Sequence, residues 1–282
     1  LNVITGPGEQ VGEALVENPN VKRVSFTGET GTGKRVAEIA AAGMKKVTLE
    51  LGGSDPMIVC DDADLESAVS GALRGRFYNC GQTCTAVKRL YIFESIAEEF
   101  IKKLETAIRN LRIGNGMHEN TDMGPLNNRS QLTYVNELVA EVEEKEEGKI
   151  VTGGNIPENT SLKNGYFFEP TLITGVSRYS RLLKEEVFGP VLPVVRVKNL
   201  DEAIEEANNS IYGLGASIWT KNLDRAVLAC ENLNAGTIWI NQHLKVAPEV
   251  PFGGIKESGI GKENGPESLS EYLDIKTIML KT

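Results

Sequence analysis

The sequence of 282 residues predicts an α/β fold, and two of its features support that prediction. Short segments rich in β-branched and aromatic residues alternate with longer segments whose apolar residues recur at helical spacing. Hydrophobic residues make up 40% of the chain and charged residues 24%, an ordinary balance for a chain that buries a core. The length allows one large domain or two modest ones.

Segments with the composition of β-strands occur along most of the chain. Each is short, is rich in Val, Ile, Thr or aromatic residues, and is bounded by turn-forming residues. The predicted strands are 21–26, 46–51, 56–59, 89–93, 191–197, 216–220 and 237–241. Residues 273–281 also have β-rich character, so we expect either an edge strand or an arm that pairs with another subunit.

The clearest predicted helix is 95–112, because apolar residues recur there every three or four positions. Further helices are predicted at 34–42, 64–76, 200–208 and 222–233. Asp201 and Asn222 are the side chains expected to cap the last two of these helices. The charge run 141–149 is typical of a solvated helix end.

Composition excludes several functional classes. A net charge of −9 disfavours nucleic acid as a partner, since phosphate backbones need a clustered positive face. No apolar run is long enough for a membrane span. The four cysteines include no CxxC pair and only two histidines are present, so we expect neither a disulfide scaffold nor a metal site. We expect a cytoplasmic protein with no nucleic acid and no membrane partner.

Cys84 is the most informative single residue. It lies in the small, polar segment 81–86, whereas Cys60 and Cys230 fit ordinary core positions. A nucleophilic thiol needs access and a lowered pKa, and the main-chain N–H groups of a loop can also stabilise an oxyanion. Cys80 lies four residues earlier, which leaves a redox pair as an alternative.

Glu50 ends a β-rich segment and is followed by Leu51, Gly52 and Gly53. It is either a satisfied carboxylate at a strand end or a general base for which the glycines leave room for water or substrate.

A glycine-rich turn at 27–33 joins a predicted strand to a predicted helix. Gly28 to Lys34 nearly spells a P-loop, but Arg35 stands where that motif has Ser or Thr to hold Mg²⁺. The turn also departs from G-x-G-x-x-G at Val36. By itself it indicates either a phosphate contact or a plain tight turn.

The order of five motifs resembles the aldehyde dehydrogenase superfamily across essentially the whole chain. The motifs are Phe-Thr-Gly at 26–28, Leu-Glu-Leu-Gly-Gly at 49–53, Gly-Gln-x-Cys at 81–84, Glu-Glu-x-Phe-Gly-Pro at 185–190 and Pro-Phe-Gly-Gly at 251–254. The separation of Glu50 and Cys84 also matches the family. The segments 51–56 and 83–85 resemble members that act on semialdehydes, which suggests succinate semialdehyde or a related short aldehyde.

The resemblance implies an aldehyde-dehydrogenase-like catalytic domain at 53–262, a remnant of the Rossmann-type dinucleotide-binding domain at 1–52 and an oligomerisation strand within 263–282. It implies NAD or NADP as cofactor, a small-molecule aldehyde as substrate and a homodimer or homotetramer. Family members carry a long portion before the segment that corresponds to Leu1, including an asparagine that helps to bind the oxyanion. We therefore expect this chain to be the C-terminal part of such an enzyme.

The implied mechanism divides the work between two residues. Cys84 attacks the aldehyde carbon, its own N–H helps to hold the oxyanion, and hydride transfer to the cofactor leaves a thioester. Glu50 then activates the water that releases the carboxylic acid.

The resemblance also implies contacts for the cofactor and the substrate. Thr27, Gly28 and Glu29 would lie near the pyrophosphate. The family commonly has serine at the position of Glu29, and a carboxylate beside phosphates is electrostatically unfavourable, so we expect Glu29 to point away. The expected cofactor-binding residues are Thr27, Gly28, Glu29, Leu51, Gly52, Glu186, which would bind the nicotinamide ribose, and Phe188, which would pack by the nicotinamide. The expected substrate-lining residues are Tyr78, Thr83, Thr85 and Phe252.

Alternatives remain at this stage. His243 and Lys245 are either polar contacts for the substrate or surface residues of the loop 241–250. A cysteine hydrolase would need a histidine base, but neither His118 nor His243 lies in a recognisable site motif. A P-loop module would lack its Mg²⁺ ligand at Arg35. The last alternative is a catalytically incomplete chain with at most cofactor-independent esterase activity.

Overall fold

The computed structural model describes residues 1–158 and 162–282. The chain forms two compact units, Leu1–Gly52 with Val246–Thr282 and Gly53–Lys245. Residues 246–262 lie in the first unit together with the C-terminal segment. The expected assignment of 1–52, 53–262 and 263–282 to functional domains stays a prediction.

The second unit is built on a seven-stranded sheet with the order β5-β6-β7-β4-β3-β8-β9. All neighbouring strands run parallel except the pair β5 and β6. The strands are β3 Asp55–Val59, β4 Val87–Phe93, β5 Lys149–Thr152, β6 Thr171–Thr174, β7 Val191–Val197, β8 Gly215–Trp219 and β9 Thr237–Ile240. Every residue of β3, β4 and β8 is buried, as expected for central strands of a parallel sheet with helices on both faces.

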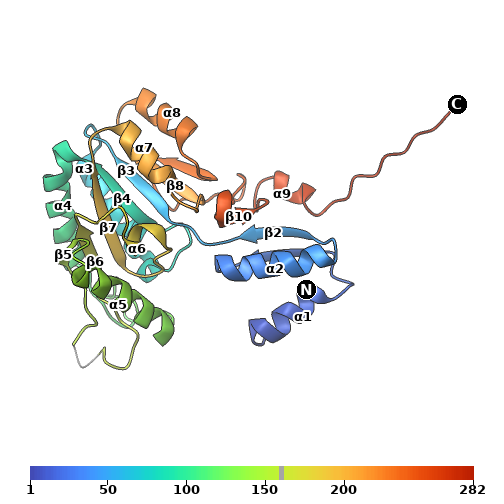
Figure 1. Ribbon diagram of the computed structural model, residues 1–282, viewed down its shortest axis with the longest axis horizontal. Helices are drawn as coiled ribbons and strands as arrows, with labels where there is room; N and C mark the ends of the chain where they lie inside the picture. Colours follow the sequence, from blue (N-terminus) through green and yellow to red (C-terminus); the bar gives the residue numbers. More distant parts are fainter. Residues whose placement is uncertain (159–161) are drawn as a thin grey trace. The chain divides into compact units, whose positions relative to one another are not determined.

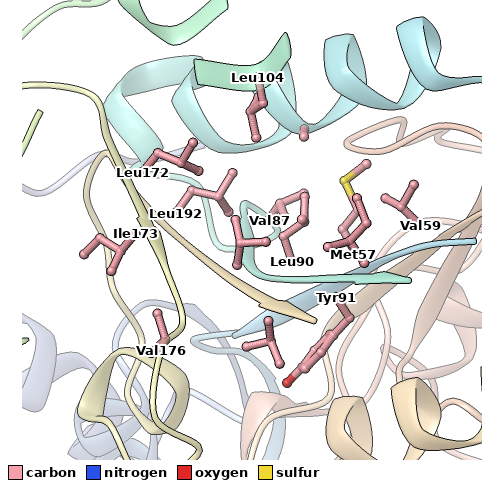
Figure 2. Close-up of a cluster of buried hydrophobic side chains, with 14 of the residues drawn as sticks. Met57, Val59, Val87, Leu90, Tyr91, Leu104, Leu172, Ile173, Val176 and Leu192 are labelled. Atoms are coloured by element: carbon pink, nitrogen blue, oxygen red, sulfur yellow. The ribbon is translucent and has the colours of Figure 1, made fainter. Parts of the chain in front are cut away.

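Helices cover both faces of this sheet. The helices are α3 Leu65–Phe77, α4 Glu94–Arg109, α5 Arg129–Glu144, α6 Arg181–Lys184, α7 Leu200–Asn208 and α8 Leu223–Asn232, with the 3-10 turn η2 at Tyr78–Gly81. Figure 1 shows α3 beside α4 and α7 beside α8. Figure 2 shows Leu90 and Leu104 on one side of β4, while Tyr91 points to the other side, where its hydroxyl donates to the carbonyl of Glu206 in α7.

The first unit is smaller. Its sheet has the order β1-β2-β10, with β1 and β2 parallel and β10 antiparallel to β2. Its elements are η1 Gly8–Gly12, α1 Glu13–Glu17, β1 Arg23–Thr27, α2 Thr30–Ala42, β2 Lys46–Glu50, η3 Lys256–Ser258, β10 Gly259–Ile260 and α9 Glu267–Ser270. Its core consists of a few buried residues, Val16, Val36, Ala40, Leu49 and Leu51, with half-buried neighbours.

The structure confirms every strand predicted before residue 242 and all the predicted helices, with ends shifted by a few residues. The segments 191–197 and 200–208 match in full as β7 and α7. The sequence analysis missed α5 and the short strands β5, β6 and β10. Of the charge run 141–149, residues 141–144 form the last turn of α5, residues 145–148 form the turn that follows, and Lys149 begins β5.

Three predictions need correction. The cap of α7 is Asn199, whose side chain accepts from the N–H of Glu202, and not Asp201, which lies inside the first turn. Helix α2 begins at Thr30, four residues before its predicted start. Residues 273–282 form no strand in this chain, so an internal edge strand is wrong. Pairing of that segment with another subunit stays a prediction.

Candidate active site

The loop that carries Cys84 leaves α3 through a left-handed turn. Asn79 and Cys80 have φ of 51° and 58°, and Gly81 follows with φ of 73°. A side chain at Gly81 would overlap the carbonyl of Gly189, so only glycine fits this place. Two non-glycine residues in the left-handed region are strained, and such strain persists where the surrounding structure holds it. The turn therefore sets where the chain delivers Cys84.

The thiol of Cys84 is half-buried. Burial is the largest influence on the pKa of the thiol, and it raises that pKa. Next in size, the charge of Lys88 lowers the pKa and Asp55 raises it. The N–H of Thr85 lowers the pKa, and Glu186 raises it. We expected a lowered pKa from the loop N–H groups, and that expectation is wrong for the chain by itself because desolvation outweighs the favourable groups. Cys80 is buried and free, and burial raises its pKa to about 12, which does not fit a redox partner.

Lys88 and Glu186 form an ion pair beside the thiol loop, with Nζ to Oε1 at 3.2 Å. The same carboxylate oxygen accepts from the N–H of Gly53 at 3.2 Å. Asp55 is completely buried and accepts from the N–H of Gly215 at 3.0 Å, and burial raises its pKa to about 7.

The segment 184–190 is held through its main chain. The fully buried guanidinium of Arg76 donates to the carbonyls of Val187, at 2.8 Å, and Gly189. The amide of Gln131 donates to the carbonyl of Phe188 at 2.9 Å. These bonds leave the side chains of Glu186 and Phe188 half-buried rather than enclosed.

The expected substrate-lining residues of this unit differ in exposure. Tyr78 is exposed, Thr83 is half-buried and Thr85 is buried. Thr85 is held from the other side by His243, whose Nε2 lies 2.7 Å from its carbonyl oxygen.

His243 has a structural place. Because a carbonyl only accepts, its Nε2 donates to Thr85, and its Nδ1 accepts from the hydroxyl of Ser217 at 3.0 Å. Burial lowers its pKa to about 4, so the ring is neutral. Both ring nitrogens are occupied, which corrects our expectation of a substrate contact or a surface role and argues against a histidine base for Cys84.

Glu50 lies in the other unit, at the end of β2. Its main chain pairs with Thr27 of β1 and Gly259 of β10, and the N–H of Gly28 donates to its carbonyl at 3.1 Å. The carboxyl group is buried, and neither oxygen has a hydrogen-bond partner. Burial, then the charge of Glu263, raises its pKa to about 8, against the opposing charge of Lys262.

Gly253 of the Pro-Phe-Gly-Gly motif lies against Glu50. A Cβ at this position would be 2.5 Å from Oε1 of Glu50, and its φ of 153° is one that other residues rarely adopt. Next to it, Phe252 is half-buried and pairs through its main chain with Glu263, with both hydrogen bonds at 2.7 Å. The motif therefore packs closely on the candidate base.

Glu29 is the cap of α2 and does not simply point away. Its carboxylate accepts from the N–H groups of Gly31 at 2.7 Å and Thr32 at 2.9 Å. These bonds, in that order, lower the pKa of Glu29. The amides that would face a phosphate thus already bind an anion. Thr27 and Gly28 are exposed beside them.

Leu51 packs against Gly33 in the first turns of α2. It is buried, its N–H donates to the carbonyl of Ser258 at 3.0 Å, and its side chain fills the place that a Cβ on Gly33 would need. Gly52 is buried beside it. Packing gives these two residues a role apart from any cofactor contact.

The structure thus forms two groups, each within one unit. One group joins Cys84 with Glu186, Thr83 and Thr85, and the other joins Glu50 with Thr27, Gly28 and Phe252. Sequence analysis missed Lys88, Asp55 and Arg76. The two adjacent basic residues Lys88 and Arg89, inside a segment 87–93 whose other residues are apolar or aromatic, were the available signal for Lys88.

Within residues 1–158 and 162–282, no group of three or more His, Cys, Asp or Glu could hold a metal ion. In the same part of the chain, no helix has the length and apolar character to cross a membrane.

Known proteins align with this chain over its full length. It is 40% identical over 281 residues to betaine aldehyde dehydrogenase of Bacillus subtilis (strain 168), which covers 100% of this chain and 57% of that protein. It is 40% identical over 282 residues to retinaldehyde dehydrogenase 3 of Mus musculus, covering 100% of this chain and 54% of that protein. The chain therefore spans a little over half the length of these relatives.

Solved structures agree. A betaine aldehyde dehydrogenase from Staphylococcus aureus in complex with NAD+ matches with a TM-score of 0.91 at 39% identity, over 95% of this chain and 53% of that one. An E. coli NADP dependent enzyme matches with a TM-score of 0.93 at 40% identity, over 98% of this chain and 56% of that one. The model described as the aldehyde dehydrogenase family matches residues 1–278. The chain belongs to the aldehyde dehydrogenase family.

Proposed function

We propose that the protein containing this chain oxidises an aldehyde to a carboxylic acid with NAD or NADP, with Cys84 as nucleophile and Glu50 as the base for hydrolysis. Family membership supports the reaction class. The observation that carries the residue assignment is Glu50, a buried carboxyl group with two oxygens that lack any hydrogen-bond partner. A buried carboxyl group with a structural role normally accepts hydrogen bonds from protein donors. A carboxyl group that binds a catalytic water molecule has oxygens without protein donors.

In the first step, Cys84 loses its S–H proton to solvent, the thiolate sulfur bonds to the aldehyde carbon, and the π electrons of the carbonyl move to its oxygen. A loop N–H can hold that oxyanion, and the N–H of Thr85 is near enough to the sulfur to lower the pKa of the Cys84 thiol. Collapse of the oxyanion expels hydride and leaves a thioester on Cys84. Burial raises the pKa of the Cys84 thiol, which favours the thiol over the thiolate.

In the second step, Glu50 takes a proton from water and the hydroxide attacks the thioester carbon. The carbon–sulfur bond breaks, the thiolate of Cys84 returns and the carboxylic acid leaves. A base with a pKa of about 8 suits this proton transfer near neutral pH.

The residues present fit a dinucleotide cofactor, with one exception. The half-buried carboxylate of Glu186 is an acceptor for ribose hydroxyls, and the half-buried ring of Phe188 is a flat apolar surface for nicotinamide. Thr27 and Gly28 are exposed for the pyrophosphate, but Glu29 occupies the adjacent amides and must turn away to free them. The bound cofactor would supply the hydride acceptor.

The proposed substrate is an aldehyde, and a semialdehyde is the finer proposal. The semialdehyde resemblance of segment 51–56 includes Ser54 and Asp55, which are only 1% exposed and so offer little surface to a substrate. The proposal now rests on Thr83, half-buried beside Cys84. The exposed apolar side chains Leu273, Ile275, Ile278, Met279 and Leu280 support a homodimer or homotetramer. The four free cysteines support a reducing, cytoplasmic location.

The test uses an activated ester, because acylation of Cys84 needs no cofactor. The chain should release nitrophenol from p-nitrophenyl acetate and carry a transient acetyl group on Cys84 by peptide mass spectrometry. Cys84→Ala should lose both signals, whereas Glu50→Gln should accumulate the acetyl group. Retention of the esterase in Cys84→Ala would refute the nucleophile. Esterase activity without reduction of NAD or NADP by an aldehyde panel would favour the catalytically incomplete chain.

A further inference from the structure

Lys88 is a lysine in an unusual place. It is the second residue of β4, where every residue is buried, and its side chain is 0% exposed. An ammonium group in such surroundings is costly unless its donors and its charge are satisfied. A core position in a parallel strand ordinarily takes Val, Ile or Leu. The cost of Lys88 therefore points to a role beyond filling the core.

The contacts of the ammonium group define that role. Its Nζ donates to the carbonyls of Cys84 at 2.6 Å and Thr83 at 3.0 Å, and lies 3.2 Å from Oε1 of Glu186. An ammonium group has three N–H donors, so these three acceptors use them all. The same Nζ lies 5.9 Å from the ring centroid of Phe188. One cation thus joins the loop of the thiol to the loop of the expected cofactor contacts.

Other charged groups also face this position. Burial is the largest influence on the pKa of Lys88, and it lowers that pKa. The negative charges of Glu186 and Asp55 raise it, the positive charge of Arg76 lowers it, and the thiol of Cys84 raises it. Lys88 in turn adds to the lowering of the pKa of His243. Two carboxyl groups therefore lie near one lysine and one thiol. Their charges raise the pKa of the thiol, and the charge of Lys88 opposes that rise.

We propose that Lys88 is a positioning residue for Cys84 and Glu186, which holds the thiol loop and the segment 184–190 together as one hydrogen-bonded assembly. It fixes the main chain on both sides of the thiol, and it keeps the Glu186 carboxylate in one place. The inference rests on the proposed function for the meaning of these two residues, but its test does not use that activity.

The test is the pH dependence of Cys84 alkylation by iodoacetamide, followed by peptide mass spectrometry so that the other thiols are scored separately. Lys88→Met should move the midpoint up by about one pH unit, which is about tenfold slower alkylation below the midpoint. Glu186→Gln should move the midpoint down, because its negative charge opposes thiolate formation. The double variant should lie closer to the parent chain than Lys88→Met does, since the two groups are coupled.

Lys88→Arg and Lys103→Met are the matched controls. Arginine keeps the charge and should restore the midpoint in part. Lys103 also forms an ion pair, with Glu66 at 2.6 Å, but lies on α4 away from the thiol loop, so its loss should leave the midpoint unchanged. If Lys88→Met does not fold, Glu186→Gln alone decides.

An unchanged midpoint in Lys88→Met or Glu186→Gln, or shifts of the same sign in both, would overturn the proposal. These outcomes are separate from the proposed function, which the ester test addresses through Cys84→Ala and Glu50→Gln.

Discussion

Glu50 and Cys84 show how burial sets the state of a reactive group. Both pKa values are raised, and in both cases desolvation is the largest cause. Burial, followed by the charge of Asp62, also raises the pKa of Cys60 to about 12, and Cys60 is fully enclosed. What distinguishes Cys84 is therefore its half-exposed position and the N–H beside its sulfur, and not a low pKa. What distinguishes Glu50 is the lack of any donor for its oxygens.

Glu50→Gln should change both activity and stability. Deacylation of the acetylated chain should rise with pH through about 8 and fall about a hundredfold or more in Glu50→Gln. The folded pKa lies above the ordinary 4.5, so the folded chain keeps a proton that the unfolded chain releases. Stability should therefore decrease as pH rises from about 4.5 to about 8, and the glutamine variant should lack that decrease.

Urea midpoints of the two chains across that pH range measure the effect. We expect Glu50→Gln to be more stable than the parent by at least about 1 kcal/mol above pH 8. Glu38→Gln, whose side chain is 71% exposed on α2, is the control and should follow the parent. Parallel curves for the parent and Glu50→Gln would show that the carboxyl group is not buried without partners.

At the scale of elements, the turn η2 and the segment 184–190 depend on each other. Gly81 packs on the carbonyl of Gly189, and Arg76, from the last turn of α3, donates to that same carbonyl. The short connection between α3 and β4 is thereby held against Gly189 by Gly81 and by Arg76. Its strained residues, Asn79 and Cys80, need this support.

Gly81→Ala should therefore destabilise the chain by about 3 kcal/mol or more, from the left-handed φ and from the overlap with Gly189. Gly175→Ala is the matched control, because Gly175 has φ of 63° and nothing within 4 Å of an added Cβ. It should cost only about 1 kcal/mol. Equal costs in thermal unfolding would mean that the Gly189 contact relaxes freely. Alkylation of Cys84 in Gly81→Ala reports whether the thiol loop has moved.

At the scale of the whole molecule, the two units have very different cores. The unit Gly53–Lys245 buries an extensive apolar cluster across its seven-stranded sheet, while the other unit buries five residues in its cluster. Buried apolar area is the main source of stability, so the units should not open with the same free energy.

Hydrogen exchange should resolve this difference. Amides of β3 and β4 should exchange only by global opening of their unit, whereas amides of β1 and β2 should exchange several orders of magnitude faster. The segment 273–282, which has no regular secondary structure, is the internal control and should exchange fastest. Equal protection of β2 and β4 would contradict a division into units of unequal stability.

The sequence by itself determined the elements and the family. Composition and periodicity marked the central strands because a strand buried on both faces must be apolar, and helices such as α4 because one face must be. Short edge strands such as β5 escaped prediction, since half-exposed segments carry little hydrophobic signal. The cap of α7 was misplaced because Asn199 and Asp201 are equally good capping residues by type.

Only the tertiary structure decided how the reactive groups are held. No local pattern tells that Lys88 reaches the carbonyl of Cys84, that both ring nitrogens of His243 are hydrogen-bonded, or that the Glu50 carboxylate has no donors. These properties depend on residues far apart in the chain, such as Glu186 for Lys88 and Glu263 for Glu50. A motif names the chemical group, but desolvation and neighbouring charges set its protonation, and these exist only after the chain has folded.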